Sequence, residues 1–395
     1  MDESFVMPSP IYTLRQLVLY FLKLGTTGFG GPVALVGYMH RDLVEERQWI
    51  TEEDYKEGLA LAQLTPGPLA AQLGIYIGYI HYGIVGATLA GFAFVLPSFI
   101  MVVTLGMAYK AYGGLSWMQA IFYCVGAAVI GIIVVSAYKL TIKSISKVDS
   151  KAVSANWLLW ILYLTGLVIT AVTESEELLF FILAGFIYML YKSLPTKRII
   201  LSKASVALLF TGFGFWEYEP EQLEKIGLFF LKAGAFVFGS GLAIVPFLHA
   251  GVVLENHWLT EGQFVDAVAV AMITPGPVVI TVGFIGYLIA GFPGASVASL
   301  ATFLPCYLFT VIPAPYFKRI AKIKSIKAFV DGITAAVAGA LMGSVIVIAS
   351  RSIKDIPTLL IAATALLTLI YFKKVKEPVI ILLAACIGII LKIIL

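Results

Sequence analysis

Long apolar runs dominate the chain and predict its architecture. Runs such as 84–108, 117–138 and 329–349 each reach the roughly 20 residues that a helix needs to cross a hydrocarbon core of about 30 Å. A transmembrane strand would need about half that length with strict alternation of apolar and polar residues, and these runs do not alternate. The pattern therefore predicts an all-α polytopic membrane protein.

Counting these runs predicts about six spans in each half of the chain and one further span between the halves. In the first half they fall at about 11–37, 57–82, 83–108, 117–138, 156–173 and 178–192. In the second half they fall at about 226–249, 263–288, 293–316, 328–350, 356–372 and 378–394, and the further run is at about 199–216. These about 13 spans divide the chain into residues 1–198, a linking span and loop at 199–225, and residues 226–395.

The two halves are diverged copies of one unit. Residues 21–68 match residues 230–277 without a gap, at an offset of 209, and about 20 of the 48 aligned positions are identical. The shared positions include Lys23 with Lys232, His40 with His249, and a Thr-Pro-Gly-Pro that begins at Thr65 and again at Thr274. An internal repeat of this length predicts two structurally equivalent units.

Loop charges predict that the second unit is inverted relative to the first. After the third predicted span the first unit has only Lys110, whereas the second has a strongly basic segment at 318–327. After the fourth span the bias reverses, because 139–151 is the basic segment of the first unit. Basic loops face the cytoplasm, so the N-terminus is expected inside and the C-terminus outside. The loop at 249–262 is also expected inside, although it contains no Lys or Arg.

Composition excludes most other classes of protein. The chain is 60% apolar and only 13% charged, with a mean hydropathy of +0.96, whereas soluble domains are nearer a quarter charged. The net charge of +4 belongs to loops between spans and does not indicate nucleic-acid binding. No P-loop, HExxH or GxSxG motif occurs, so neither an enzyme nor a cofactor is predicted. Cys124, Cys306 and Cys386 lie far apart in apolar segments and are expected to be buried hydrophobes, not metal ligands.

Each unit contains two predicted helix breaks. Glycines interrupt the first span and a Pro-Gly-Pro interrupts the second, and non-helical backbone at membrane depth is tolerated only where it is buried or lines a cavity. The break residues are Gly30, Gly31 and Pro32 with Pro66, Gly67 and Pro68, and in the second unit Gly239, Ser240 and Gly241 with Pro275, Gly276 and Pro277. Paired breaks in inverted halves indicate a substrate site near the midplane, where helix N-termini favour an anion. The alternative is that they are kinks and close-packing glycines.

Side chains near the breaks supply candidate ligands for that anion. Lys23 and Lys232 lie within spans, where a lysine costs about 2.5–3.5 kcal/mol, so we expect them to neutralise a divalent oxyanion together; the alternative is that each extends to an interface. The polar residues that flank the Pro-Gly-Pro segments and can donate hydrogen bonds are Gln63, Thr65, Gln72, Thr274 and Thr281. Further candidates are Arg41 and Arg47, which could recruit anions or be solvated loop charges, and His40 and His249, which could take part in proton coupling or pack at an interface.

At these residues the chain resembles the chromate ion transporter (CHR) family in its long two-domain form. The motifs are Phe29-Gly30-Gly31-Pro32, the arginine-containing loop with Trp49, and Pro66-Gly67-Pro68 followed by Gln72. The second unit has Phe238-Gly239-Ser240-Gly241 and its own Pro-Gly-Pro. The resemblance covers essentially the whole chain. It implies export of chromate, with sulfate as a similar competitor.

We therefore expect a multi-pass secondary transporter of the cell (inner) membrane that exports chromate, and sulfate-like oxyanions beside it, by membrane potential or ion exchange. An interior negative by 100 mV drives a dianion outward by about 4.6 kcal/mol, and the sequence shows no conspicuous intramembrane carboxylate to carry cations for uptake. An organic-anion exporter and a sulfate uptake transporter remain alternatives, as does a homodimer. The chain has no acid–base constellation of the kind that a membrane enzyme or lipid-site assembly factor would need.

Overall fold

The computed structural model describes residues 11–29, 31–113, 115–145, 150–174, 178–193, 222–237, 241–317, 324–353, 355–372, 375 and 377–394. The regular structure of these residues is entirely helical. Four helical stretches are long and apolar enough to cross a membrane, at Leu69–Tyr112, Ser116–Ile142, Val278–Tyr316 and Ser325–Ser352. The whole of the predicted linking span, 199–216, lies outside the described residues.

The described helices follow the same order in the two repeats. The first repeat contains α1 (Leu14–Thr27), α2 (Gly31–Met39), the π-helix η1 (His40–Glu46), α3 (Glu52–Leu64), α4 (Leu69–Tyr112), α5 (Ser116–Ser144), α6 (Ser150–Ala155), α7 (Trp157–Thr173) and α8 (Leu178–Ser193). The second contains α9 (Gln222–Ala235), η3 (Gly241–Ile244), α10 (Val245–His249), η4 (Ala250–Glu255), α11 (Glu261–Ile273), η5 (Val278–Ile280), α12 (Thr281–Val311), η6 (Ala314–Tyr316), α14 (Lys324–Ser352), α15 (Ile356–Tyr371) and α16 (Glu377–Ile394).

The long elements α4 and α12 are each a hairpin of two helical arms. The arms of α4 meet at Gly83, whose φ of 58° is a left-handed conformation that glycine adopts readily. Gly78 and Gly86 lie against each other, since a Cβ placed on Gly78 would be 2.3 Å from the Gly86 carbonyl oxygen. Eight residues along a straight helix would span about 12 Å, so the chain has turned back on itself. The helix α12 repeats this arrangement at Gly291, with φ 62°.

The first helices of the first repeat enter the molecule and return to the same end. The ring of Tyr12, just before α1, stacks on Trp49, just after η1, at 4.8 Å, and its hydroxyl lies 2.6 Å from His81 Nδ1 at the end of the first arm of α4. In the same way α3 runs antiparallel to that arm, because Gly58 packs against Tyr76. We call this end of the molecule the N-end.

This arrangement corrects two predicted crossings of the first repeat, 11–37 and 57–82. The equivalent crossings of the second repeat, 226–249 and 263–288, are corrected in the same way, because α9 has 14 residues and α11 has 13. The glycine and proline breaks stop α1 after 14 residues and α3 after 13, about 20 Å of helix, which is short of a hydrocarbon core of about 30 Å. After each break the chain turns back. The two segments are therefore re-entrant pairs, α1 with α2–η1 and α3 with the first arm of α4, and their tips lie inside the molecule.

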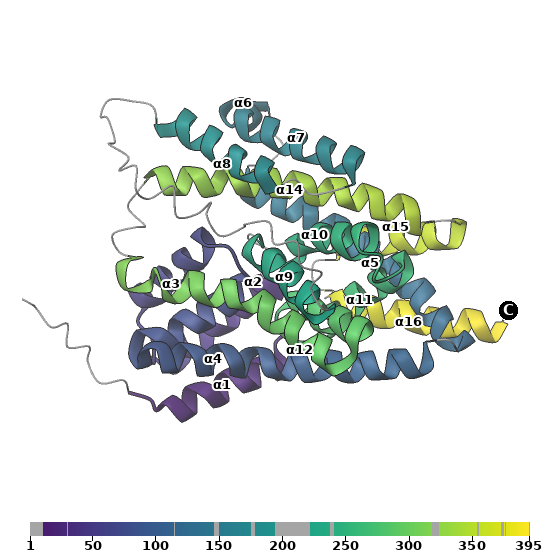
Figure 1. The fold of residues 1–395 in the computed structure, drawn as a ribbon, viewed down its shortest axis with the longest axis horizontal. Coiled ribbons are helices and arrows are strands. Elements are labelled where there is room, and N and C mark those ends of the chain that lie inside the picture. Colours follow the sequence, from purple (N-terminus) through teal and green to yellow (C-terminus); the bar gives the residue numbers. More distant parts are fainter. Residues whose placement is uncertain are drawn as a thin grey trace, which may run out of the picture.

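The second repeat enters from the opposite end, which we call the C-end. The second arms of α4 and α12 run antiparallel, since Thr88 bonds Tyr307 (hydroxyl to hydroxyl, 2.7 Å) and Phe99 packs on Phe292 (ring centroids 6.1 Å apart). Arg351, at the end of α14, binds Glu261 at the start of α11. In Figure 1 the first residues of α1 lie towards the left and the C-terminus at the right.

The loop at 249–262 therefore lies at the C-end, whereas the basic end of α5 lies at the N-end. The start of α5 is fixed at the C-end by a 2.6 Å hydrogen bond from Tyr123 to Asp355, and its last residue, Ser144, lies about 32 Å along the axis from Tyr123. The prediction that 249–262 shares a face with 139–151 is wrong. The prediction fails because it counts each re-entrant pair as a crossing of the membrane. A position on the opposite face explains why the loop at 249–262 has no Lys or Arg.

The two repeats are interleaved. The helix α5 of the first repeat packs against α15 and α16 of the second, and α14 of the second packs against α7 and α8 of the first. Figure 1 shows α14 alongside α7 and α8. Small residues permit this closeness, because a Cβ on Gly339 would lie 1.9 Å from the carbonyl oxygen of Tyr163. Each repeat thus shares its core with the other.

Candidate functional site

The helix breaks of the two repeats lie in contact and are hydrogen-bonded to each other. The Gly67 N–H donates to the carbonyl of Val237 (2.6 Å), and the Gly276 N–H donates to the carbonyl of Gly28 (3.0 Å). Both the donors and the acceptors are 209 residues apart, so the two bonds are equivalent. The Pro-Gly-Pro of each repeat is therefore hydrogen-bonded to the broken first helix of the other, and we call this contact the joint. Its two N–H groups are satisfied within the protein and do not bind a ligand.

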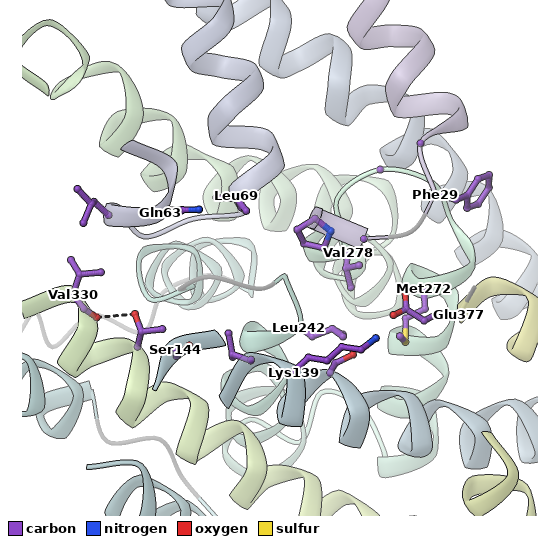
Figure 2. Close-up of a pocket in the computed structure, with 18 of the residues that line it drawn as sticks. Phe29, Gln63, Leu69, Lys139, Ser144, Leu242, Met272, Val278, Val330 and Glu377 are labelled. Carbon is purple, nitrogen blue, oxygen red and sulfur yellow. Dashed lines mark hydrogen bonds between the residues drawn. The ribbon is translucent and has the colours of Figure 1, made fainter. Parts of the chain in front are cut away.

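A cavity of about 670 Å³ lies beside this joint and is lined by both repeats (Figure 2). Its wall contains Gly31, Leu69 and Glu377, which are the first residues of α2, α4 and α16, together with Val278 at the start of η5. A helix N-terminus carries a partial positive charge and unpaired N–H groups, so helix starts that converge on one cavity favour an anion.

The cavity also contains charged side chains, two of which belong to the basic segments predicted as loops. Lys139 lies on α5 and Lys327 on α14, and both line the cavity, as do Asp331 and Glu377. Figure 2 shows Lys139 extending towards Glu377, and the two interact electrostatically. The four formal charges cancel. Helix starts direct partial positive charge at the cavity, which the ends of α1, α3 and α11 also border at Gly28, Gln63 and Thr274.

A signal in the sequence could have identified this wall. On α5 the lining polar residues are Ser136, Lys139 and Ser144, and on α14 they are Lys327, Asp331 and Thr334. Their spacings of three to five residues put each set on one face of a helix. In otherwise apolar segments such a face indicates water or ligand, whereas the loop-charge pattern places the two lysines in cytoplasmic loops.

Several predicted residues do line the cavity. They are Gly31 and Pro32 at the first break, Gln63 at the end of α3, and Thr274 with Gly276 at the second Pro-Gly-Pro. The helices stop where the sequence predicts, since α3 ends at Leu64, before Pro66 and Pro68, and α11 ends at Ile273, before Pro275 and Pro277. Gly30, Gly239 and Ser240 lie outside the described residues. Gly241 is buried in η3 and is not part of the wall.

Gln72 and Thr281 occupy structural positions. Gln72 is fully buried, and its Nε2 donates both to the hydroxyl of Thr65 (2.9 Å) and to the carbonyl of Pro66 (2.7 Å). Thr281 is 1% exposed and donates to the carbonyl of Val278 (2.8 Å). Neither residue lines the cavity, so the geometry supports a role in holding the breaks and not in contacting a ligand.

Lys23 and Lys232 do not line the cavity either. Lys23 is exposed on α1, and Lys232 is exposed on α9, where it borders a separate hollow of about 470 Å³ with Phe229 and Trp258. A direct role for these lysines stays a prediction. The cations that line the cavity in the described part of the chain are Lys139 and Lys327.

The two predicted arginines are engaged at the N-end surface. Arg41 pairs with Asp42 (2.7 Å), and the Arg47 guanidinium stacks on Trp49 at 4.6 Å from the ring centroid. His40 Nε2 lies 2.8 Å from Glu52, and that bond, with one from Lys56, holds the pKa of Glu52 below its ordinary value. These contacts fix η1 to the start of α3 outside the cavity.

The equivalent histidine of the second repeat is buried in a network at the C-end. His249 lies 2.8 Å from Glu261, which also accepts a 2.6 Å hydrogen bond from Arg351, and Arg351 in turn binds Glu174 of the first repeat. The network joins α11, α14 and the end of α7. It closes the C-end, whereas the cavity wall extends towards the N-end through the last turns of α5 and the first turns of α14.

Comparison with known proteins identifies the family of this chain. The chromate transporter family matches residues 15–190 and 225–389. The chain is 62% identical to the chromate transport protein of Cupriavidus metallidurans over 98% of this chain and 95% of that protein. It is 56% identical to the probable chromate transport protein of Synechococcus elongatus over 98% of each, and 27% identical to the chromate transport protein of Pseudomonas aeruginosa over 97% of this chain and 94% of that protein. No solved structure matches.

The family match covers both repeats, including the breaks that form the joint and the helices that line the cavity. Family and relatives are transporters and not enzymes. The chain belongs to the chromate transporter family.

Proposed function

We propose that this chain is a multi-pass secondary transporter that exports chromate across the cell (inner) membrane, with sulfate-like divalent oxyanions as weaker substrates. The observation that carries the proposal is the cavity at the joint of the two breaks, where helix N-termini and two lysines converge. The names of the relatives with 62% and 56% identity support chromate as the oxyanion.

The orientation follows from charge. Described basic residues at the N-end include Arg15, Arg41, Arg47, Lys56 and Lys192, whereas those at the C-end are Lys110, Lys225 and Arg351, of which Arg351 is paired with two glutamates. By the positive-inside rule the N-end faces the cytoplasm. The repeats are then inverted and the cavity opens inward, which is the loading state of an exporter that works by alternating access.

Matched cysteines test the orientation. Arg47 and Asn256 occupy equivalent, exposed positions, so after replacing the exposed Cys386 with serine we expect Arg47→Cys to be labelled from the cytoplasm and Asn256→Cys from outside. Lys192→Cys should follow Arg47→Cys. The measurement is labelling by a membrane-impermeant thiol reagent in intact cells and in inverted vesicles. Labelling of positions 47 and 256 from one face would contradict inversion.

Flux measurements test the substrate and the driving force. In proteoliposomes with imposed potassium-diffusion potentials, we expect chromate flux to follow the sign of the potential, since a dianion gains about 4.6 kcal/mol per 100 mV. Sulfate should compete, and a dicarboxylate should compete poorly. Chromate flux that ignores the potential would rule out electrogenic export.

Proton-coupled uptake is the second candidate, and particular residues favour it. Two carboxylates, Asp331 and Glu377, line the cavity, although the sequence shows no conspicuous carboxylate within a predicted span. Two protons bound with a dianion would cancel its charge. A flux driven by a pH gradient at zero potential would favour this mechanism over electrogenic export.

A further inference from the structure

A buried carboxylate at the C-end lies outside the cavity and the proposed anion site. Asp266 on α11 is 8% exposed, and its Oδ2 accepts a 2.7 Å hydrogen bond from the hydroxyl of Tyr109. Tyr109 belongs to α4, so this bond joins the two repeats across the closed end. Asp266 also lies eight residues before Thr274 of the cavity wall on the same helix, about 12 Å along its axis.

No cation balances this carboxylate within the described residues. Several elements lie next to α11 and carry titratable or charged groups at this end. These groups are Tyr109 and Lys110 of α4, Tyr123 and Cys124 of α5, His249 of α10, Glu255 of η4, Tyr287 of α12, Arg351 of α14 and Cys386 of α16. Arg351 is paired with Glu261 and Glu174, and Lys110 is exposed. Asp266 forms no ion pair with any of these groups.

Burial of a carboxylate ion costs several kcal/mol unless a cation or several hydrogen bonds compensate it. The Tyr109 hydroxyl provides one such bond. The closed C-end therefore favours the neutral acid at Asp266. If α11 moves away from α4, water reaches the carboxyl group and the ion is no longer penalised.

The equivalent position in the first repeat is also a carboxylate. Glu57 lies 209 residues before Asp266, at the corresponding place on α3, and it is only half-buried at the end where the cavity opens. One carboxyl group is thus sealed at the closed end while its counterpart is more exposed at the open end. Alternation between inward-facing and outward-facing states would exchange these two environments.

We propose that Asp266 binds a proton that holds the C-end closed, and that Glu57 does the same at the N-end when the transporter faces the other way. The inference rests on the alternating access of the proposed function. Each proton binds and leaves at its own face, so it gates the transporter and does not cross the membrane. A rise in pH at the C-end ionises Asp266 and favours opening of that end.

A labelling experiment tests this without any substrate. Val265→Cys places a thiol at a residue that is 5% exposed beside Asp266, in full-length protein that lacks Cys386. Its labelling by a membrane-impermeant reagent from the C-end is divided by that of the exposed Asn256→Cys at each pH, which corrects for the ionisation of an exposed thiol. The same ratio in the Asp266→Asn background corrects for the different ionisation of a buried thiol. We expect this ratio to rise with pH, by at most tenfold per pH unit because one proton is released.

Adding Asp266→Asn should leave the ratio low at every pH, since the amide is always neutral. Tyr109→Phe should keep the pH dependence but displace it, and Glu57→Gln should leave the response of the C-end unchanged. A ratio that is independent of pH in the parent, or an unchanged pH profile in Asp266→Asn, would overturn the gate. Loss of chromate flux in all proteins with the labelling pattern intact would instead reject only the proposed substrate.

Discussion

Replacing Gly276 with alanine is expected to abolish transport or folding, because the joint between the repeats has no room for a side chain there. Gly276 has φ +95°, and a Cβ would lie 2.0 Å from the Ser98 hydroxyl oxygen. The left-handed conformation alone costs an alanine about 1–2 kcal/mol. Relief of the overlap would displace the turn that donates to the carbonyl of Gly28. We expect at least a tenfold loss of folded protein or of transport.

Two variants separate the causes of that loss. Gly262→Ala, at the start of α11, is the matched control, because no neighbouring atom lies within 4 Å of its added Cβ and transport should be unchanged. Gly276→Ala combined with Ser98→Ala removes the nearest atom but keeps the strained backbone, so it should recover part of the yield. Yield by size-exclusion chromatography and flux in proteoliposomes provide the readouts. Normal yield and flux for Gly276→Ala would show that the joint is not needed.

Removal of both cavity lysines is expected to have the next largest effect. Two unit charges 4 Å apart attract by about 4 kcal/mol at an effective dielectric constant of about 20, and desolvation offsets much of that. We expect Lys139→Ala and Lys327→Ala each to raise the half-saturating chromate concentration about tenfold, or about 1.4 kcal/mol. Together they should make transport undetectable at low chromate concentrations.

The neighbouring carboxylate provides an internal test. Lys139→Ala leaves Glu377 without its cationic neighbour, so adding Glu377→Gln should restore part of the affinity. Lys23→Ala, on the exposed face of α1, is the matched control and should transport like the parent. If Lys23→Ala loses transport while Lys139→Ala and Lys327→Ala do not, the anion site is that of the sequence prediction and not the cavity.

Local signals in the sequence predicted where the helices break. The Pro-Gly-Pro segments stop their helices because proline lacks an N–H, and Thr274 and Gly276 at the second of these breaks line the cavity. Hydropathy could not show whether the chain continues or turns back after a break. That is why 11–37 appeared to be a crossing.

The charged residues were harder to predict because their role depends on how helices face one another. Lys23 repeats as Lys232, yet both are exposed on the outer faces of their helices. Lys139 and Lys327 resemble ordinary loop charges near the ends of apolar runs. Only the packing of α5 and α14 against the opposite repeat turns them towards a common space.

The packing of α5 against helices of the second repeat has a consequence for biosynthesis. The helix α5 ends at Ser144, but the helices that cover it begin at Ile356 and Glu377, more than 200 residues later. At about 5–20 residues per second, the ribosome takes on the order of 10 to 40 seconds to make the intervening chain. During that interval the face of α5 that later packs against α15 and α16 lies against lipid or an insertion factor. The final core can form only after translation is nearly complete.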